Sequence, residues 1–321
     1  MTRPMGETAH GSTPGGAQDG AWTLVRAASA AADALDRAGR DATFTLDASG
    51  ALQPVAPGAA LLEWRPGPGW VALLPPDDPR RALVDLYLPI CSATAARPIV
   101  VGHLGESLDG FIATHTGDSQ FVTGRENILH MHRMRALCGA VVVGAGTVAA
   151  DDPQLTTREV EGENPLRVIF DPSRRLTPEY RVFHDDAAPT VYACARSLLD
   201  GRTRVGLAEA IGLDEEPPGA SVAGLVRALR ARGCHRIFVE GGGVTVSAFL
   251  EAELLDRLHV AVAPLLIGSG RPAIRLTARD ALRDCRRPHH RVFRMGSDVL
   301  FDCDLRHRAG TADCAGVERI V

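Results

Sequence analysis

The segment AVVVGAGTVAADDPQLTTR, residues 140–158, joins an uninterrupted apolar run to a glycine turn and a polar loop. An apolar run without polar alternation is typical of a strand covered on both faces, as in a parallel sheet between helices. Similar runs, each bounded by glycine or acidic residues, recur from Pro98 onward, at residues 99–104, 166–171, 190–195, 235–243 and 257–264. This repetition predicts an α/β domain.

Helical patterns lie between these runs, at about residues 124–138, 221–232 and 244–255. Alternation of strands and helices predicts a mostly parallel mixed sheet flanked by helices. Two further strand-like segments flank Gly296 and Ser297, a pair typical of a tight turn. We therefore expect the sheet to end in a C-terminal antiparallel hairpin.

The N-terminal part of the chain has a different composition and pattern. An alanine-rich run from Trp22 to about Leu35 predicts a helix, short strand-like pieces follow, and SATAARP at residues 92–98 has the composition of a linker. We predict four parts: a disordered N-terminus at 1–20, a small α+β appendage of unknown role at 21–95, the α/β domain at 96–308 and a loose tail at 309–321. The appendage shows no catalytic constellation.

Composition excludes several classes of protein. The chain has 321 residues, a formal net charge of -4, and 35 basic residues that are all arginine. The charge does not favour nucleic acid or a membrane surface as a partner, and the lack of lysine excludes a Schiff-base enzyme or a Walker-type phosphate loop. No run approaches the ~18 apolar residues of a membrane span, and the N-terminus lacks the apolar core of a signal peptide. We expect a cytoplasmic protein.

The seven cysteines are scattered and form no C-x-x-C pair, which argues against a disulfide framework and a structural zinc site. His130 and His132 are two residues apart on a predicted helix and therefore point away from each other. His289 and His290 lie in an arginine-rich loop. We assign no metal.

Two glycine-containing strand ends are the candidate binding loops. After residues 140–143, Thr147 is placed to cap a short helix whose first N–H groups would face a phosphate or hydroxyl, and Asp151 follows in the loop. After the second strand, Glu240 precedes three glycines and a helix, an arrangement suited to a pyrophosphate. Ordinary tight turns explain both patterns as well, and Glu240 could equally cap a helix or face a ligand. Neither loop matches G-x-G-x-x-G.

Two arginines are candidate anion ligands. Arg135 shares a helix face with Ile128 and Met131, which is unusual without an anion to bind, although a snorkelling side chain would give the same pattern. Arg158 follows the loop of Asp151. Two guanidinium groups can grip one phosphate.

Taken together, SLDGFIA (107–113), GDSQFVTG (117–124), residues 141–158, FVEGGGVTVSAFL (238–250) and HVAVAPLLIG (259–268) resemble the reductase domain of riboflavin biosynthesis in order and spacing. The resemblance covers about residues 98–306 and implies a dihydrofolate reductase-like fold. It implies NADPH-dependent reduction of 5-amino-6-(5-phosphoribosylamino)uracil, or of its diamino-pyrimidinone counterpart, to the ribitylamino product. Family members are commonly dimers, and we expect a homodimer.

The same resemblance implies the roles of individual residues. The substrate positions are Ser119, Arg135, Leu155, Arg158 and Glu240. The NADPH positions are Gly105, Phe121, Thr147, Asp151, Gly242, Gly243, Val244, Thr245, Val246, Ser247 and Ala248. Asp151 is also the implied catalytic residue. Arg174 and Arg175 are weaker candidates for the 2′-phosphate and could equally be solvated surface charges.

The chemistry requires the ribosylamine to open to an imine, whose C1′ accepts hydride while a proton reaches nitrogen or a ring oxygen. We expect Asp151 to orient the nicotinamide or relay the proton, and Glu240 to hold the substrate.

Some features depart from the family pattern. Phe121 stands where tryptophan is common, Glu106 places an acid near the presumed nicotinamide, and the H-x-E and P-C-x-x-C motifs of the zinc deaminase are missing. Two alternatives therefore remain: a reductase of the same fold that acts on a pterin or a specialised pyrimidine, and a non-catalytic nucleotide-binding module.

Overall fold

The computed structural model describes residues 14–120, 122–216 and 219–308. The chain forms two compact units, Met1–Ala93 and Thr94–Val321, and each is described by itself. The predicted tail at 309–321 and the first thirteen residues lie outside the described residues. The first helix begins at Pro14, so residues 14–20 are helical rather than part of a disordered N-terminus.

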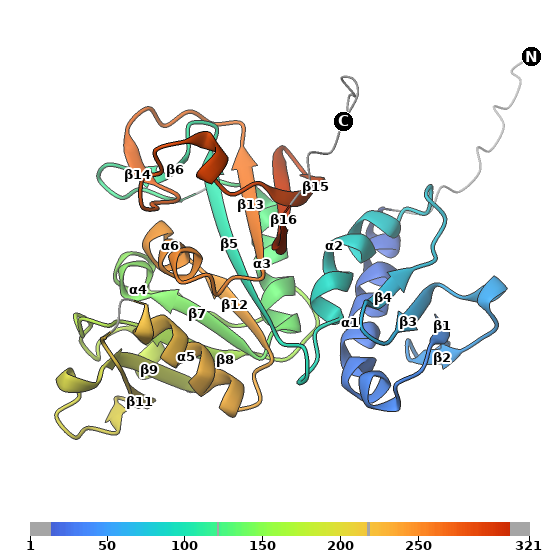
Figure 1. Ribbon diagram of the computed structural model, residues 1–321, viewed down its shortest axis with the longest axis horizontal. Helices are drawn as coiled ribbons and strands as arrows, with labels where there is room; N and C mark the ends of the chain where they lie inside the picture. Colours follow the sequence, from blue (N-terminus) through green and yellow to red (C-terminus); the bar gives the residue numbers. More distant parts are fainter. Residues whose placement is uncertain (1–13, 121, 217–218, 309–321) are drawn as a thin grey trace, which may run out of the picture. The chain divides into compact units, whose positions relative to one another are not determined.

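The first unit packs two helices on a four-stranded antiparallel sheet (Figure 1). Its elements are α1 (Pro14–Ala38), β1 (Ala42–Leu46), β2 (Leu52–Pro54), β3 (Leu62–Arg65), β4 (Gly69–Ala72) and α2 (Arg81–Cys91), with strand order β2-β1-β3-β4. Trp64 and Trp70 contact each other edge to face with their ring centroids 5.2 Å apart, and Trp70 Nε1 donates a hydrogen bond to the carbonyl of Ala28. Aromatic residues therefore supply much of this small core.

The second unit is built on a ten-stranded sheet. In spatial order its strands are β10 (Arg204–Val205), β11 (Ala208–Leu213), β9 (Thr190–Ala195), β8 (Leu166–Phe170), β7 (Ala140–Gly144), β12 (Arg236–Glu240), β5 (Ile99–Ser107), β13 (Arg257–Ala263), β16 (Asp298–Arg308) and β15 (Pro288–Met295). Neighbours from β11 to β13 are parallel, and β10, β16 and β15 pair antiparallel. The predicted mixed sheet and its C-terminal hairpin are confirmed.

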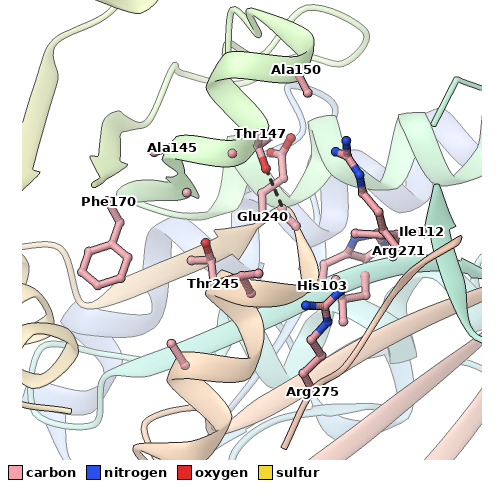
Figure 2. Close-up of a pocket in the computed structure, with 18 of the residues that line it drawn as sticks. His103, Ile112, Ala145, Thr147, Ala150, Phe170, Glu240, Thr245, Arg271 and Arg275 are labelled. Atoms are coloured by element: carbon pink, nitrogen blue, oxygen red, sulfur yellow. Dashed lines mark hydrogen bonds between the residues drawn. The ribbon is translucent and has the colours of Figure 1, made fainter. Parts of the chain in front are cut away.

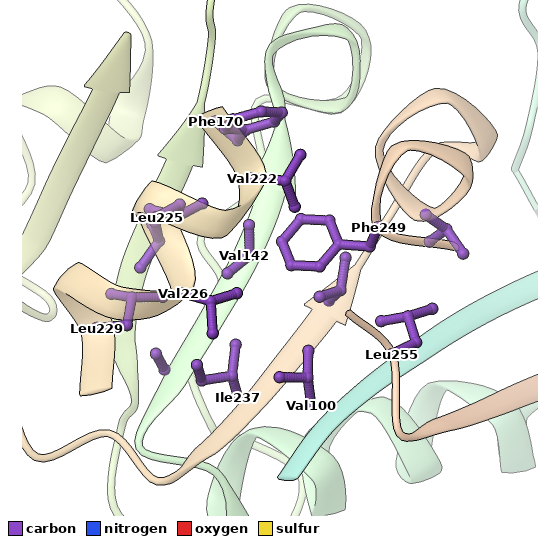
Figure 3. Close-up of a cluster of buried hydrophobic side chains, with 14 of the residues drawn as sticks. Val100, Val142, Phe170, Val222, Leu225, Val226, Leu229, Ile237, Phe249 and Leu255 are labelled. Atoms are coloured by element: carbon purple, nitrogen blue, oxygen red, sulfur yellow. The ribbon is translucent and has the colours of Figure 1, made fainter. Parts of the chain in front are cut away.

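Helices cover both faces of this sheet, as its apolar strands require. They are α3 (Arg125–Leu137), α4 (Ala145–Asp151), α5 (Ala220–Ala231) and α6 (Gly243–Glu251). Leu225 and Leu229 of α5 and Phe249 of α6 pack on Val142 and Ile237 of the central strands (Figure 3). A separate two-stranded ribbon pairs β6 (Phe111–Thr114) with β14 (Gly270–Pro272).

Helix α3 buries Met134 and Leu137 but also packs on the sheet through several polar side chains, unlike α5. The register places His103 of β5 opposite Glu240 on one side and His259 of β13 on the other. Directly paired residues share a face of the sheet, and Asn127 and His130 of α3 hydrogen-bond to His103 and His259. The face that carries His103 and Glu240 is therefore the α3 face.

Candidate functional site

A cavity of about 1080 Å³ opens beyond the carboxyl ends of β5, β7, β8 and β12 (Figure 2). This edge of an open α/β sheet is where ligands bind. Ten of the residues predicted as site residues line it: Gly105, Ser119, Thr147, Asp151, Glu240, Gly242, Gly243, Val244, Thr245 and Ala248. The cavity therefore gathers residues that lie far apart in the sequence.

The two candidate strand ends meet inside this cavity. The N–H of Gly242, after β12, donates to Thr147 Oγ1, after β7, over 3.1 Å (Figure 2). Thr147 was expected to cap its helix, and this expectation is wrong: α4 begins at Ala145 with Gly144 as the cap residue. Thr147 instead lies within the first turn of α4, where its hydroxyl ties the second loop to the first.

Close packing explains one of the glycines. A Cβ at Gly144 would lie 2.1 Å from Thr245 Oγ1, so only glycine lets α6 approach the end of β7 this closely. The N-terminus of α6 has no side-chain cap, because its cap residue is Gly242. The first N–H groups of a helix lack intrahelical acceptors and favour an anion. Gly242, Gly243 and Val244 all line the cavity, so this turn fits the phosphates of a dinucleotide.

Two of the predicted cofactor residues do not line the cavity. Val246 packs in the apolar core under α6. Ser247 is buried, and its Oγ accepts a hydrogen bond from the N–H of Arg275 over 2.8 Å. Their neighbours Thr245 and Ala248 do line the cavity, as the helical period allows. Phe121 lies outside the described residues.

Glu240 and Arg135 form a buried ion pair. Arg135 Nε donates to Glu240 Oε2 over 2.7 Å, Nη2 donates to Oε1, and Nη1 donates to the carbonyl of Thr156. Each side chain is 9% exposed. A carboxylate at the end of a buried strand requires such a partner. Glu240 lines the cavity and Arg135 lies behind it, so the cation expected to face a substrate anion instead orients a carboxylate.

The loop after α4 carries the remaining predicted substrate residues. Leu155 is buried in a left-handed conformation with φ 58°, and neither Leu155 nor Arg158 lines the cavity. Arg158 Nη1 donates to Thr156 Oγ1 over 2.6 Å, and its N–H donates to His132 Nδ1. Partial burial lowers the pKa of Arg158, with a further contribution from Arg135.

Asp151 ends α4 and lines the cavity. Burial raises the pKa of its carboxyl above the usual value, while the nearby Arg271 acts in the opposite direction. Asp152, the next residue, does not line the cavity and accepts a hydrogen bond from the N–H of Arg181 over 2.7 Å. Of the two acids of the Asp-Asp-Pro motif, Asp151 therefore faces the cavity and Asp152 binds the backbone of a neighbouring segment.

The sequence did not single out several cavity residues. Arg271 and Arg275 follow the strand β13 and line the cavity (Figure 2). A Cβ at Gly117 would lie 2.5 Å from Arg271 Nη2, so the turn after β6 leaves room for this guanidinium. Arginine in a glycine-rich segment was the available signal, but an arginine in a loop is more often solvated.

The structure places Arg174 and Arg175 in different surroundings. Arg175 lines the cavity next to Ser173. Arg174 Nη1 instead donates to the carbonyl of Leu198 over 2.7 Å. Of the two, only Arg175 is placed to contact a ligand of this cavity.

Among the described residues, no group of three His, Cys, Asp or Glu side chains could hold a metal ion. Within the same part of the chain, none of the helices is both long and apolar enough to cross a membrane.

Comparison with known proteins matches residues 98–301 to the RibD C-terminal domain. A 2,5-diamino-6-ribosylamino-4(3H)-pyrimidinone 5′-phosphate reductase of Methanothermobacter thermautotrophicus is 32% identical over 217 residues, which are 65% of this chain and 99% of that protein. The protein of the same name from Archaeoglobus fulgidus is 30% identical over 59% of this chain and 91% of its own length. The riboflavin biosynthesis protein RibD of Aquifex aeolicus is 29% identical, and the match spans 58% of its length.

Solved structures share the architecture. A deaminase and 5-amino-6-(5-phosphoribosylamino)uracil reductase of Thermotoga maritima superimposes with a TM-score of 0.54 at 27% identity, over 70% of this chain and 61% of that one. The riboflavin biosynthesis reductase Rib7 of Saccharomyces cerevisiae gives a TM-score of 0.51 at 17% identity, over 64% and 89% of the two chains, which is a likeness of fold. The chain thus spans about three-fifths of the T. maritima and A. aeolicus proteins and nearly all of the archaeal reductase from M. thermautotrophicus.

Proposed function

The chain belongs to the RibD C-terminal domain family, and on this premise we propose that its cavity binds NADPH and reduces a 5′-phosphorylated ribosylamino-pyrimidine. The product is the corresponding ribitylamino-pyrimidine of riboflavin biosynthesis. The observation that carries the proposal is the convergence of two strand ends, where Gly242 bonds to Thr147 beside Asp151 and Glu240. Positioning of two molecules in one cavity is the main task in such a hydride transfer.

The cofactor side of the cavity is formed by α4 and α6. The N–H groups at Gly243 and Val244 suit the pyrophosphate, and Arg175 with Ser173 suits a 2′-phosphate, which would favour NADPH over NADH. The bound cofactor supplies the hydride. Thr147 and Gly242 hold the two loops together so that this side keeps its shape.

The substrate side is formed by the segment before α3 and by Glu240. Ser119 and Glu240 line it, and Arg135 fixes the Glu240 carboxylate through two hydrogen bonds. Arg158 lies outside the cavity but close to Glu240, and it supplies positive charge for the substrate phosphate. Arg271 lies across the cavity near Asp151 and contributes a second cation.

Asp151 is the proton relay of the proposal. In the reduction the imine carbon takes a hydride and the imine nitrogen takes a proton. Burial raises the pKa of Asp151, so this carboxyl carries the proton that a general acid must donate more often than an exposed one does. The neutral form also avoids repulsion with Glu240, which raises the pKa of Asp151 in the same direction.

The decisive experiment is NADPH oxidation by the purified full chain. The two phosphorylated ribosylamino-pyrimidines are compared with dihydrofolate, and NADPH with NADH, with the product identified by mass. We expect turnover with a phosphorylated pyrimidine and NADPH, and a product heavier by two hydrogens. Turnover with dihydrofolate alone, or cofactor binding without oxidation, contradicts the proposal.

Asp151→Asn tests the proton relay. We expect kcat to fall by about 10²-fold, the lower range for loss of a general acid, with little change in KM for either ligand. Asp152→Asn is the matched control, because Asp152 lies outside the cavity and asparagine tolerates its left-handed backbone. Equal kinetics and equal pH profiles for Asp151→Asn and the wild type would exclude the relay.

The family resemblance also supports a homodimer that works in the cytoplasm. Light scattering of the purified chain measures the oligomeric state, and a monomer at working concentrations contradicts the proposed homodimer.

A further inference from the structure

His103 lies in the wall of the cavity without an assigned role. It is on β5, directly opposite Glu240 in the register of β5 and β12, and both side chains line the cavity (Figure 2). The residue is only 3% exposed. A polar ring that is buried but borders a ligand cavity has either a structural partner or a ligand to meet.

One edge of the ring has a structural partner. His103 Nε2 lies 2.9 Å from Asn127 Oδ1, and Asn127 Nδ2 donates to Thr123 Oγ1 over 2.9 Å. The oxygen of the Asn127 amide therefore faces the imidazole, so Nε2 carries the proton. A Cβ at Gly105 would lie 2.8 Å from Thr123 Cγ2, so this glycine leaves space for the chain of bonds.

The other ring nitrogen is left as an acceptor. The hydrogen bond that holds the ring among the described residues uses Nε2, and the neutral tautomer then has its lone pair on Nδ1. Burial lowers the pKa of His103 to about 3, with His259 and Arg135 acting in the same direction, so the ring is neutral near pH 7. His130 packs on the ring with centroids 5.3 Å apart.

The neighbours of His103 place its ring on the substrate side of the cavity. Asn127, Thr123 and Met131 line the cavity from α3 and the residues before it, whereas the phosphate-binding turn belongs to α6. Both oxygens of Glu240 already accept hydrogen bonds from Arg135. A pyrimidine with ring N–H and exocyclic amino groups brings several donors, and His103 on the adjacent strand offers an additional acceptor.

We propose that His103 Nδ1 accepts a hydrogen bond from an N–H group of the pyrimidine ring and thereby selects a substrate with a donor at that position. His103 is then a substrate-binding residue, and Asn127 and Thr123 are positioning residues that set its tautomer. The inference rests on the proposed function and adds to it a residue that binds the pyrimidine ring rather than the phosphate.

Two substitutions separate the ring nitrogens. In His103→Asn the amide oxygen can occupy the place of Nδ1, whereas in His103→Gln the amide nitrogen can occupy the place of Nε2 and keep the bond to Asn127. We expect His103→Gln to raise KM for the pyrimidine about tenfold, with KM for NADPH unchanged, and His103→Asn to stay within about threefold of wild type. His130→Asn is the matched control, because His130 is equally buried and does not line the cavity.

Equal loss in both His103 variants indicates a structural role and overturns the inference, as does an effect on KM for NADPH alone or no effect in His103→Gln. Absence of wild-type turnover with any pyrimidine overturns the proposed function and this inference together. The failures are therefore distinguishable.

A spectroscopic readout does not depend on turnover. With ¹⁵N-labelled histidine, we expect His103 to be the neutral Nε2–H tautomer, and the phosphorylated pyrimidine to shift its Nδ1 resonance towards that of a hydrogen-bonded acceptor. Ribose 5-phosphate, which lacks the ring, should leave that resonance in place. A resonance unmoved by the pyrimidine, or moved equally by ribose 5-phosphate, contradicts the inference.

Discussion

Buried charge in this protein is tolerated where each charge has a partner. Arg135 and Glu240 are 105 positions apart in the chain and meet at the wall of the cavity. Taking two charges out of water costs several kcal/mol per ion, and attraction offsets this cost only with good geometry. The two parallel hydrogen bonds provide that geometry.

Removal of either partner should therefore be costly. We expect Arg135→Met and Glu240→Leu each to lower the free energy of unfolding by about 3 kcal/mol, because each leaves an unpaired buried charge. The double variant should lose clearly less than the sum. Urea denaturation of the four proteins measures the coupling, and additivity within about 0.5 kcal/mol would show that the pair does not interact.

Among the secondary-structure elements, α3 is exceptional because it buries imidazole and amide groups against the sheet in addition to apolar side chains. A row of directly paired residues crosses five strands beneath it: Glu240, His103, His259, Asp302 and Arg291. Arg291 Nη2 donates to Asp302 Oδ2 over 2.6 Å. Asp302 Oδ1 lies 3.3 Å from His259 Nε2 without the geometry of a hydrogen bond. This row ties α3 to the sheet through polar contacts.

The row should make folding sensitive to acid. Burial lowers the pKa of His103 to about 3 and that of His130 well below the ordinary 6.5. At pH values between the lowered pKa and 6.5, the unfolded chain therefore binds more protons than the folded protein. The contribution to stability is fully present above about pH 6.5 and is lost as the pH falls, by at most about 1.4 kcal/mol per pH unit for each histidine. Denaturation from about pH 7 to pH 5 measures the slope, which should be shallower in His130→Asn. An identical slope would show that His130 does not titrate this way.

The junction of α6 with the β14 segment depends on a glycine. A Cβ at Gly243 would lie 2.0 Å from the carbonyl oxygen of Ala273. We expect Gly243→Ala to destabilise the protein by about 2 kcal/mol, since backbone rather than a flexible side chain must move. In Gly146→Ala no atom lies within 4 Å of the added group, and a helical alanine should instead stabilise by up to about 1 kcal/mol. Thermal unfolding measures both, and equal shifts would contradict the packing argument.

In the whole molecule, the cavity belongs to one of the two compact units. Its lining residues run from His103 to Thr277, within the unit Thr94–Val321. The unit Met1–Ala93 has its own core around Trp64, Trp70 and Tyr87. The described part of that unit supplies no lining residue.

Catalysis should therefore survive removal of the first unit. We expect a chain that begins at Thr94 to fold and to keep kcat/KM within about threefold of the full protein, less than 1 kcal/mol in transition-state energy. Steady-state kinetics of the shortened chain test this, with circular dichroism as the control for folding. A folded but inactive product would show that the first unit contributes to the reaction.

Much of the sheet could be predicted from local pattern. The apolar runs at 140–143 and 235–240 became β7 and β12, because strands buried on both faces need continuous apolar residues. Helix ends were less predictable: α6 ends at Glu251 rather than near residue 255, and α1 begins at Pro14. Helix ends depend on caps and neighbours that a periodic pattern does not contain.

The candidate site was predicted by residue type but not by partner. Glu240, Thr147 and Asp151 could be selected because glycine turns and acids follow buried strands. Their bonding could not be predicted, so the tie between Thr147 and Gly242 replaced the expected helix cap.

The chain's own pattern of apolar runs and glycine turns was sufficient to predict an α/β domain and its candidate binding loops, because secondary structure follows from period and turn chemistry over a few residues. The pairing of Arg135 with Glu240 and the tautomer of His103 required the folded molecule. Strand order and register decide which distant groups meet in the buried interior, and there each group's charge and hydrogen bonds depend on its neighbour.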